Sequence, residues 1–235
     1  MTTPYVGAQT SNVSNQSSIQ MRVECAIDAL LTSLPNPEHA SADQRRGIIT
    51  RYSAVLEGNF IYWMTGAYLA VKSEPARAII LENLHEEVRD CHPGMLRRFA
   101  LAAHAVPTDL DAMAVYEELT KVRLFVGRLS AVPIEVMMAF FEGFIQKFMA
   151  FLAELAAGQG SSEREYTDVH GVCDIAHTDG LFRALQAEMA INPPDAATNV
   201  FEGVDLLSRL IQRIVEGPAR NGFEMISSAN ALLPA

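Results

Sequence analysis

The sequence predicts an all-α protein folded as a single up-and-down helical bundle. Apolar residues recur at spacings of three and four along almost the whole chain, and no segment alternates apolar and polar residues between turns as a half-buried strand does. The 235 residues are enough for one sizeable core, and their composition requires no second one. We expect about seven to nine helices in one domain over residues 17–235, after a flexible lead-in over residues 1–16.

Proline and capping signals place the helix breaks in the first half of the chain. Pro35-Asn36-Pro37 ends the first helix, and Ser73-Glu74-Pro75 begins the third, with proline in the first turn where its missing N–H is harmless. The residue before Pro93 is disfavoured in helical geometry, so the third helix should end near Asp90 and leave His92 at a helix break. The helices predicted for this half cover residues 18–34, 42–71, 73–90 and 94–105.

Glycine and proline divide the helical pattern again in the second half. Gly158-Gln159-Gly160 ends a long apolar helix, and the next begins at Ser161 or Ser162, with Glu165 in the capping-box position for the latter. Asn192-Pro193-Pro194 closes that helix. The helices predicted for this half cover residues 109–129, 133–157, 161–190 and 195–215, with a short last turn after Pro218.

Composition and charge exclude several classes of partner. The formal charge of −10 and the lack of a basic stripe argue against nucleic acid, because phosphate binding needs Lys and Arg on one surface. The N-terminus has no basic n-region or apolar h-region, and the most apolar stretch, residues 132–157, contains too many polar residues for a membrane span. Three cysteines without a CxxC pair indicate reduced thiols. We expect a soluble, cytoplasmic protein without nucleic-acid or membrane partners.

The motif His170-x-x-x-Asp174-x-x-His177 is the most informative for chemistry. On a helix these three side chains fall within roughly 60° of one another, between small or apolar residues suited to a core. Burying such a face without partners would be unfavourable, and a metal ion would bind both imidazoles and neutralise the carboxylate. A solvated face and a core hydrogen-bond pair are the alternatives. Cys173 lies at the edge of the ligand face and is not predicted to be a nucleophile.

Acidic residues at three other places support a metal site. The segment 81–92 carries an acidic run, including Glu86 and Glu87, that leads to a histidine at the helix break. Glu142 lies among Met and Phe residues in the apolar segment 132–157, where an unpaired charge is strongly disfavoured. Glu57 lies in the middle of another long apolar helix. Each buried glutamate could instead belong to a structural ion pair.

Four carboxylates and three imidazoles would match two divalent cations. Four negative charges balance two divalent ions, and mixed oxygen and nitrogen ligands on helices suit iron or manganese better than zinc or calcium. Aromatic residues such as Phe141 or Phe144 could wall a pocket beside them. The carboxylates are those of Glu57, Glu87, Glu142 and Asp174, and the imidazoles are those of His92, His170 and His177.

The order of these residues resembles the haem-oxygenase-like diiron oxidases over roughly residues 57–185. The matching features are Glu on the first long helix, an Asn-Leu-x-Glu-Glu run leading to His, Glu on a later helix and then His-x-x-x-Asp-x-x-His. The resemblance implies that Glu87 bridges two ferrous ions, that the other six residues complete the ligand set and that Glu87 and Glu142 are catalytic. The gap between Glu87 and His92 is shorter than expected, so three acids remain alternatives. Glu86 could be the bridge, and Glu82 or Asp90 could be a further ligand.

The same resemblance implies an oxidase or oxygenase that uses dioxygen as co-substrate and acts on a small molecule in specialised metabolism. N-oxygenation and oxidative carbon–carbon cleavage of amino or fatty acids are the reactions it suggests. An amino-acid-derived substrate is expected, because polar and basic residues near the site could hold a zwitterion. Arg89, Arg97 and Arg98 are expected to be solvated, although an arginine near His92 could pair with a substrate carboxylate. The alternatives are a metal-independent enzyme resembling thiaminases or coenzyme PQQ synthesis proteins, and a non-catalytic helical iron-binding protein. A homodimer and an external electron donor are left open.

Overall fold

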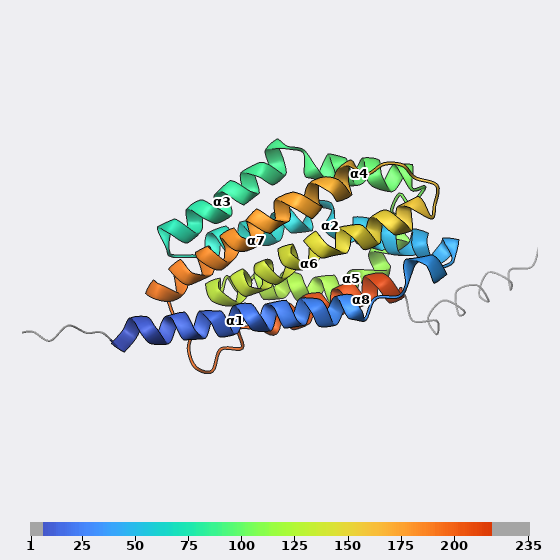
Figure 1. The fold of residues 1–235 in the computed structure, drawn as a ribbon. Helices are drawn as coiled ribbons and strands as arrows, with labels where there is room; N and C mark the ends of the chain where they lie inside the picture. The colour runs from blue at the N-terminus through green and yellow to red at the C-terminus, as the bar shows by residue number, and fades with distance from the viewer. Residues whose placement is uncertain (1–6, 218–235) are drawn as a thin grey trace, which may run out of the picture.

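The structure, a computed structural model, describes residues 7–217, with side chains described from Ser18 onward. These residues form eight α-helices and one short 3₁₀ helix, in agreement with the predicted all-α bundle (Figure 1). The last turn predicted after Pro218 lies outside the described residues. The α-helices are α1 Gly7–Thr32, α2 Ala42–Ala70, α3 Glu74–Arg89, α4 His92–Ala102, α5 Asp109–Val126, α6 Ala131–Ala157, α7 Glu165–Ile191 and α8 Glu202–Glu216, and the 3₁₀ helix is Pro37–His39.

Two predicted helix starts are corrected at the ends of the chain. α1 begins at Gly7, so residues 7–16 are helical rather than a lead-in, because no proline interrupts the chain between this start and Thr32. α8 begins only at Glu202, after Pro193-Pro194 and two turns that occupy the segment predicted to be helical.

The start of α7 is corrected as well, because the predicted capping box does not form. α7 begins at Glu165 itself. The Ser161 hydroxyl instead accepts the backbone N–H of Glu163, and the Glu163 carboxylate accepts the backbone N–H of Glu165. The turn before the helix is therefore closed locally by side-chain acceptors.

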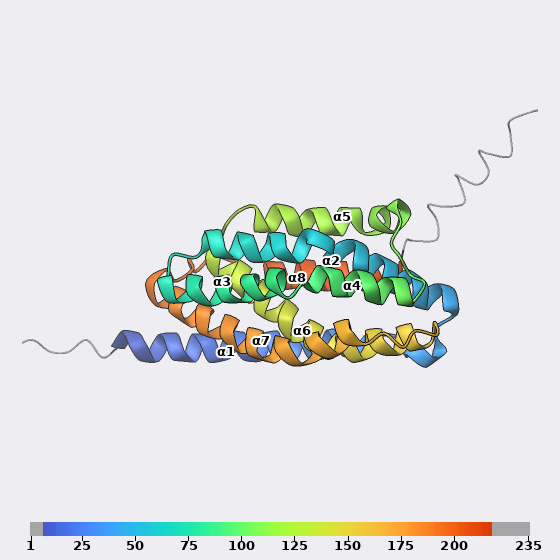
Figure 2. The ribbon, with the colours of Figure 1, turned by 90° about the horizontal axis from the view of Figure 1, so that it is seen from above.

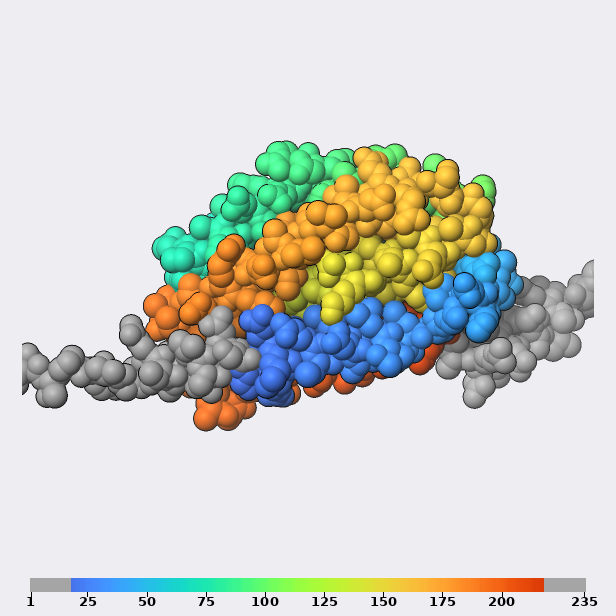
Figure 3. All heavy atoms as spheres, in the orientation of Figure 1, coloured from blue at the N-terminus to red at the C-terminus, as the bar shows by residue number. Residues whose placement is uncertain are grey.

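α6 lies at the centre of the bundle and contacts α1, α2, α7 and α8. α3 and α4 lie over α2 and α7, whereas Figure 2 shows α1 and α5 at opposite edges. Figure 3 shows the face on which α1, α6 and α7 lie edge to edge. The site described below lies between α2, α6 and α7, under the junction of α3 and α4.

By length and composition α6 could cross a membrane, contrary to the expectation that its polar residues exclude this. It is the one such helix within residues 7–217, and 83% of its most apolar window is buried within the bundle. Packing against four other helices accounts for that composition, since a helix that is apolar on all sides can be buried in a protein core.

α2 is interrupted in its middle by a kink. Glu57 and Gly58 have non-helical backbone angles, and Gly58 has φ +81°, which glycine adopts without the steric penalty of a side chain. The residues on either side of the kink, Leu56 and Phe60, line the main pocket, whereas Glu57 is exposed.

A carboxyl group with no evident function lies deep in the core. Glu135 in α6 is 0% exposed, and neither of its oxygens has a hydrogen-bond partner in the described part of the chain. Burial, reinforced by the nearby carboxylate of Glu188, raises the pKa of Glu135 to about 9. Glu188 itself accepts the backbone N–H groups of Lys72 and Ser73 at the start of α3. In the folded protein Glu135 is therefore protonated at neutral pH.

We expect Glu135→Gln to remove part of the pH dependence of stability. The folded protein keeps the Glu135 proton up to about pH 9, whereas the unfolded chain releases it above about pH 4.5. The free energy of unfolding must therefore fall as the pH rises between these values. From about pH 5.5 to about pH 8 the wild type should lose roughly 3 kcal/mol more than the variant. Urea denaturation at both pH values measures this difference, and equal losses would contradict the assignment.

Candidate metal centre

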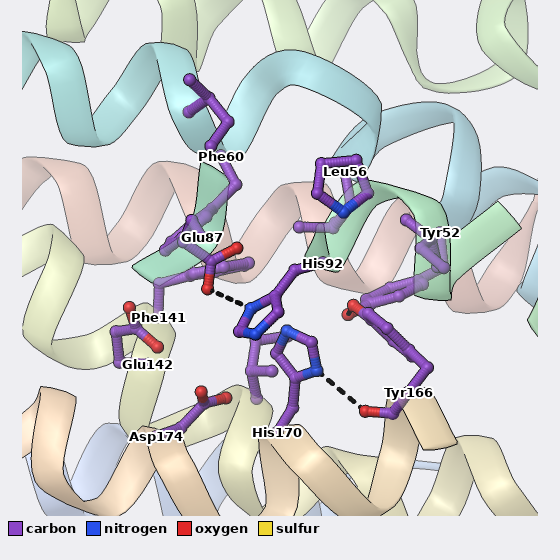
Figure 4. Close-up of a pocket in the computed structure, with 14 residues that line it drawn as sticks. Tyr52, Leu56, Phe60, Glu87, His92, Phe141, Glu142, Tyr166, His170 and Asp174 are labelled. Atoms are coloured by element: carbon purple, nitrogen blue, oxygen red, sulfur yellow. Dashed lines mark hydrogen bonds and ion pairs between the residues drawn. The ribbon is translucent and has the colours of Figure 1, made fainter. Parts of the chain in front are cut away.

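Buried carboxylates and imidazoles gather in one pocket between α2, α6 and α7 (Figure 4). The helical motif in α7 places His170, Asp174 and His177 on one buried face, as predicted from their spacing. α6, which packs against α7, contributes Glu142. Five of the seven predicted ligands line the pocket, and a sixth, His177, lies within ion-pair distance of two of them. The five are Glu87, His92, Glu142, His170 and Asp174.

Glu87, His92 and His170 form the first group of possible metal ligands. One ligand atom from each lies within 4.8 Å of the other two, and all three residues are buried. His92 Nδ1 is 2.7 Å from Glu87 Oε1. His170 Nδ1 donates a 2.8 Å hydrogen bond to the backbone carbonyl of Tyr166, which leaves Nε2 free as a ligand atom. Burial lowers the pKa of His170 to about 4, so this imidazole is neutral, as a metal ligand must be.

Glu142, Asp174 and His177 form the second group. His177 Nδ1 lies 3.7 Å from Asp174 Oδ1 and 3.8 Å from Glu142 Oε1. These distances are too long for hydrogen bonds but close to the separation of about 3.0–3.6 Å between two atoms that ligate one ion. His177 Nε2 is 2.8 Å from a carboxylate oxygen of Glu86. An imidazole whose second nitrogen donates to a carboxylate is typical of metal-binding histidines.

Unsatisfied polar atoms show that this second group fits a cation. Glu142 Oε1, Asp174 Oδ2 and His177 Nδ1 are buried and have no hydrogen-bond partner among the side chains and backbone that the structure describes. Burying such atoms is unfavourable unless something binds them. A divalent ion between them would bind all three residues, and the mixed oxygen and nitrogen set suits iron.

The pKa shifts of the pocket residues also indicate that the pocket can bind cations. Burial, reinforced by Glu142, raises the pKa of Asp174 to about 9. Burial opposes the charged form of His177, but the carboxylates of Glu142, Glu86 and Asp174 outweigh it and raise the pKa of His177 to about 10. The pocket therefore holds protons where bound cations would supply positive charge.

Glu57, the seventh predicted ligand, is not brought to this pocket. It lies at the kink of α2, is exposed, and accepts a 2.8 Å hydrogen bond from Arg97 Nε of α4. The predicted set of seven ligands is therefore corrected to six, because Glu57 is not among the residues that meet here. The physical reason is the non-helical backbone at Glu57 and Gly58, which turns the carboxylate outward while its neighbours Leu56 and Phe60 face inward.

The acidic run on α3 separates into residues that reach the site and residues that do not. Glu87 is buried in the pocket, and Glu86 reaches the site as well, through His177. Only Glu87 of the two lines the pocket, whereas Glu86 turns toward His177 on the neighbouring helix α7. Glu82 and Asp90 are exposed, and Asp90 pairs with its neighbour Arg89.

The helix break predicted between Asp90 and Pro93 brings Glu87 and His92 together despite their short separation in the sequence. α3 ends at Arg89, and Cys91 adopts a left-handed conformation with φ 58°. α4 then begins at His92, two residues before its predicted start at Gly94, and the imidazole turns back to contact Glu87.

The remaining wall of the pocket is largely apolar. Phe141 lines it, as predicted, whereas Phe144 lines a smaller adjoining cavity. Tyr52 and Tyr166 also line the pocket, and their hydroxyl oxygens are 2.7 Å apart. The sequence analysis did not identify these two tyrosines as pocket residues. For Tyr166 the only signal was its place one helical turn before His170, and Tyr52 carried none. The other apolar residues of the wall are Leu56, Phe60, Ile61, Pro93, Leu96 and Ile145.

The three arginines near His92 in the sequence are solvated, as expected, and none is placed to pair with a substrate in the pocket. Arg89, Arg97 and Arg98 are exposed, and each pairs with a carboxylate, in the case of Arg98 that of Glu165. None of them lines the pocket.

Comparison with known proteins gives one match. Residues 51–211, more than half of the chain, match a protein family described as iron-containing redox enzyme. The matched region includes α3, α4, α6 and α7, which carry every residue of the two ligand groups. No match was found among curated proteins or among solved structures.

Proposed function

The chain belongs to the iron-containing redox enzyme family, and from this premise we propose that it is a non-haem diiron oxidase or oxygenase that activates dioxygen. The observation that carries the proposal is the pair of adjoining ligand groups, one formed by Glu87, His92 and His170 and the other by His177 with the carboxylates of Glu142 and Asp174. Glu87, His92 and His170 would hold one ion, and Glu142, Asp174 and His177 the other. Bound ferrous iron supplies the electrons with which dioxygen is reduced.

The protein's own residues orient the ligands and exclude water. The Tyr166 carbonyl fixes the ring of His170, and the Glu86 carboxylate fixes that of His177. Aromatic and aliphatic side chains of α2 and α6 close the other side of the pocket. In such a dry environment a reactive oxidant is protected from side reactions with solvent.

The shape and chemistry of the pocket favour a mostly apolar substrate. The adjoining cavity is lined almost entirely by apolar side chains of α2, α6 and α8, and it shares Tyr52, Leu56, Phe141 and Ile145 with the main pocket. The polar groups of its lining residues are the Tyr52 hydroxyl and the Trp63 indole N–H, which has no hydrogen-bond partner in the part of the chain that the structure describes. In a pair of hydrogen-bonded hydroxyls one O–H remains available to a substrate. Oxidative carbon–carbon cleavage of an aliphatic acid therefore suits the site better than turnover of an amino acid, because the apolar cavity can hold a hydrocarbon chain but offers little to a polar amino-acid backbone.

Anaerobic titration with ferrous iron, followed by oxygen exposure with a panel of fatty acids and amino acids, tests the proposal. We expect two equivalents of iron to bind and aliphatic acids to stimulate oxygen consumption more than amino acids do. Stable iron binding without oxygen consumption would favour an iron-binding protein. Turnover without added metal would favour the metal-independent alternative.

Glu86→Ala is expected to weaken metal binding by about 10- to 100-fold, because it removes the carboxylate that orients His177. Glu86→Gln should have a smaller effect, since the amide oxygen still accepts the imidazole N–H. Equilibrium iron titrations of both variants measure the change. Glu82→Ala is the matched control, because Glu82 is an exposed acid on the same helix. Equal iron affinity of Glu86→Ala and Glu82→Ala would show that Glu86 does not position a ligand.

A further inference from the structure

A cysteine lies beside the second ligand group. Cys173 precedes Asp174 on α7 and is half-buried, and its Sγ donates a hydrogen bond to Asp174 Oδ1 over 3.1 Å. Ligand atoms of Cys173, Asp174 and His177 all lie within 4.8 Å of one another. On helical geometry Cys173 projects on the side of the ligand face nearest His177, since positions 173 and 177 are one turn apart.

The distance from sulfur to carboxylate matches that of two atoms bound to one metal ion. Metal–sulfur bonds of about 2.3 Å and metal–oxygen bonds of about 2.1 Å, at angles between octahedral and tetrahedral, separate the two ligand atoms by about 3.1–3.6 Å. The 3.1 Å between Cys173 Sγ and Asp174 Oδ1 falls at the lower end of this range. An ion could therefore replace the thiol hydrogen without large movement of either side chain.

Two neighbouring atoms point to a ligand independently of the cysteine. Asp174 is 0% exposed and His177 is 4% exposed. Within the residues that the structure describes, neither Asp174 Oδ2 nor His177 Nδ1 has a hydrogen-bond partner. The hydrogen bond from Cys173 satisfies only Oδ1 of Asp174. The other two cysteines, Cys25 and Cys91, are exposed and belong to neither ligand group.

We propose that Cys173 is a sulfur ligand of the metal ion held by Asp174 and His177. On binding, the thiol proton leaves to solvent and a metal–sulfur bond replaces the hydrogen bond to Asp174. The two metal positions then differ, because the group of Glu87, His92 and His170 offers only oxygen and nitrogen. Sulfur is a softer ligand and selects softer metals, so the second position should accept cobalt, zinc or iron readily. This inference rests on the proposed function, because it concerns the same pocket.

Anaerobic titration of the full chain with cobalt(II) tests the proposal through a readout other than activity. A cobalt–thiolate bond gives an intense near-ultraviolet charge-transfer band, which nitrogen and oxygen ligands do not give. We expect the band in the wild type and in the controls Cys25→Ser and Cys91→Ser. It should be lost in Cys173→Ser and in Cys173→Ala, while the weaker visible bands of cobalt bound to nitrogen and oxygen remain.

Two results would overturn the sulfur ligand and leave the metal centre intact. One is cobalt binding to the wild type without the charge-transfer band, and the other is a band that persists in both Cys173 variants. Failure of the wild type to bind cobalt or iron at all would instead refute the proposed metal centre, and the sulfur ligand with it.

Discussion

Replacing His177 with alanine is expected to abolish oxygen consumption and one equivalent of iron binding, while the helical content stays close to that of the wild type. The imidazole is the one nitrogen in the second ligand group, at 3.7 Å and 3.8 Å from the carboxylates of Asp174 and Glu142. Without it, two buried carboxylates lose the ligand that completes the ion's coordination. Little apolar surface is removed, so the bundle should still fold. Anaerobic iron titration and circular dichroism measure both effects.

His170→Ala is expected to have the same consequence for the first ligand group. His85→Ala is the matched control for both variants, because His85 is an exposed histidine on α3 outside both groups. Full turnover by either pocket variant at saturating iron would mean that the ligand set is wrongly assigned.

Glu87→Gln is expected to reduce iron binding from two equivalents toward one. Glu87 is buried, contacts His92 and lines the same pocket as Glu142 and Asp174, so its carboxylate lies where it can serve both ions. Glutamine keeps the size and the hydrogen bonding of the side chain but removes the shared charge. The measurement is the stoichiometry of an anaerobic iron titration.

Glu86→Gln is the control for that experiment. Both acids reach the site, but Glu86 contacts only the imidazole of His177, on the side away from the carboxylates. It should therefore retain two equivalents of iron. If Glu86→Gln bound only about one equivalent of iron and Glu87→Gln still bound two, Glu86 would be the bridging carboxylate.

Much of the fold and the α7 part of the site were predictable, because they depend on local periodicity. The spacing of His170, Asp174 and His177 determines that they share a helical face, whatever packs against it. The break that turns His92 back toward Glu87 followed from a local rule about the residue before Pro93. These features need no knowledge of the tertiary structure.

The features that escaped prediction depend on tertiary contacts. A single glycine within a long apolar pattern does not predict a helix kink, so the kink at Gly58 could not be foreseen. The ion pair that holds Glu57 outside the pocket is formed with Arg97, which lies forty residues away in the sequence. Glu142 was predicted as a ligand from its place among apolar residues, but Glu135 has the same surroundings in the sequence, and only the structure separates Glu142 in the pocket from Glu135 outside it.

The hydrogen bond between Glu86 and His177 marks the side of the pocket that lies near solvent, whereas the opposite side is apolar. The Glu86 side chain is 35% exposed and that of His177 only 4%, so their contact at the seam of α3 and α7 links the buried site to bulk water. The opposite boundary consists of aliphatic and aromatic side chains of α2, α6 and α8, where a charged species would lose its hydration without compensation. We therefore expect iron and protons to enter and leave along the α3–α7 seam. Dioxygen, small and apolar, can reach the same centre from the other side.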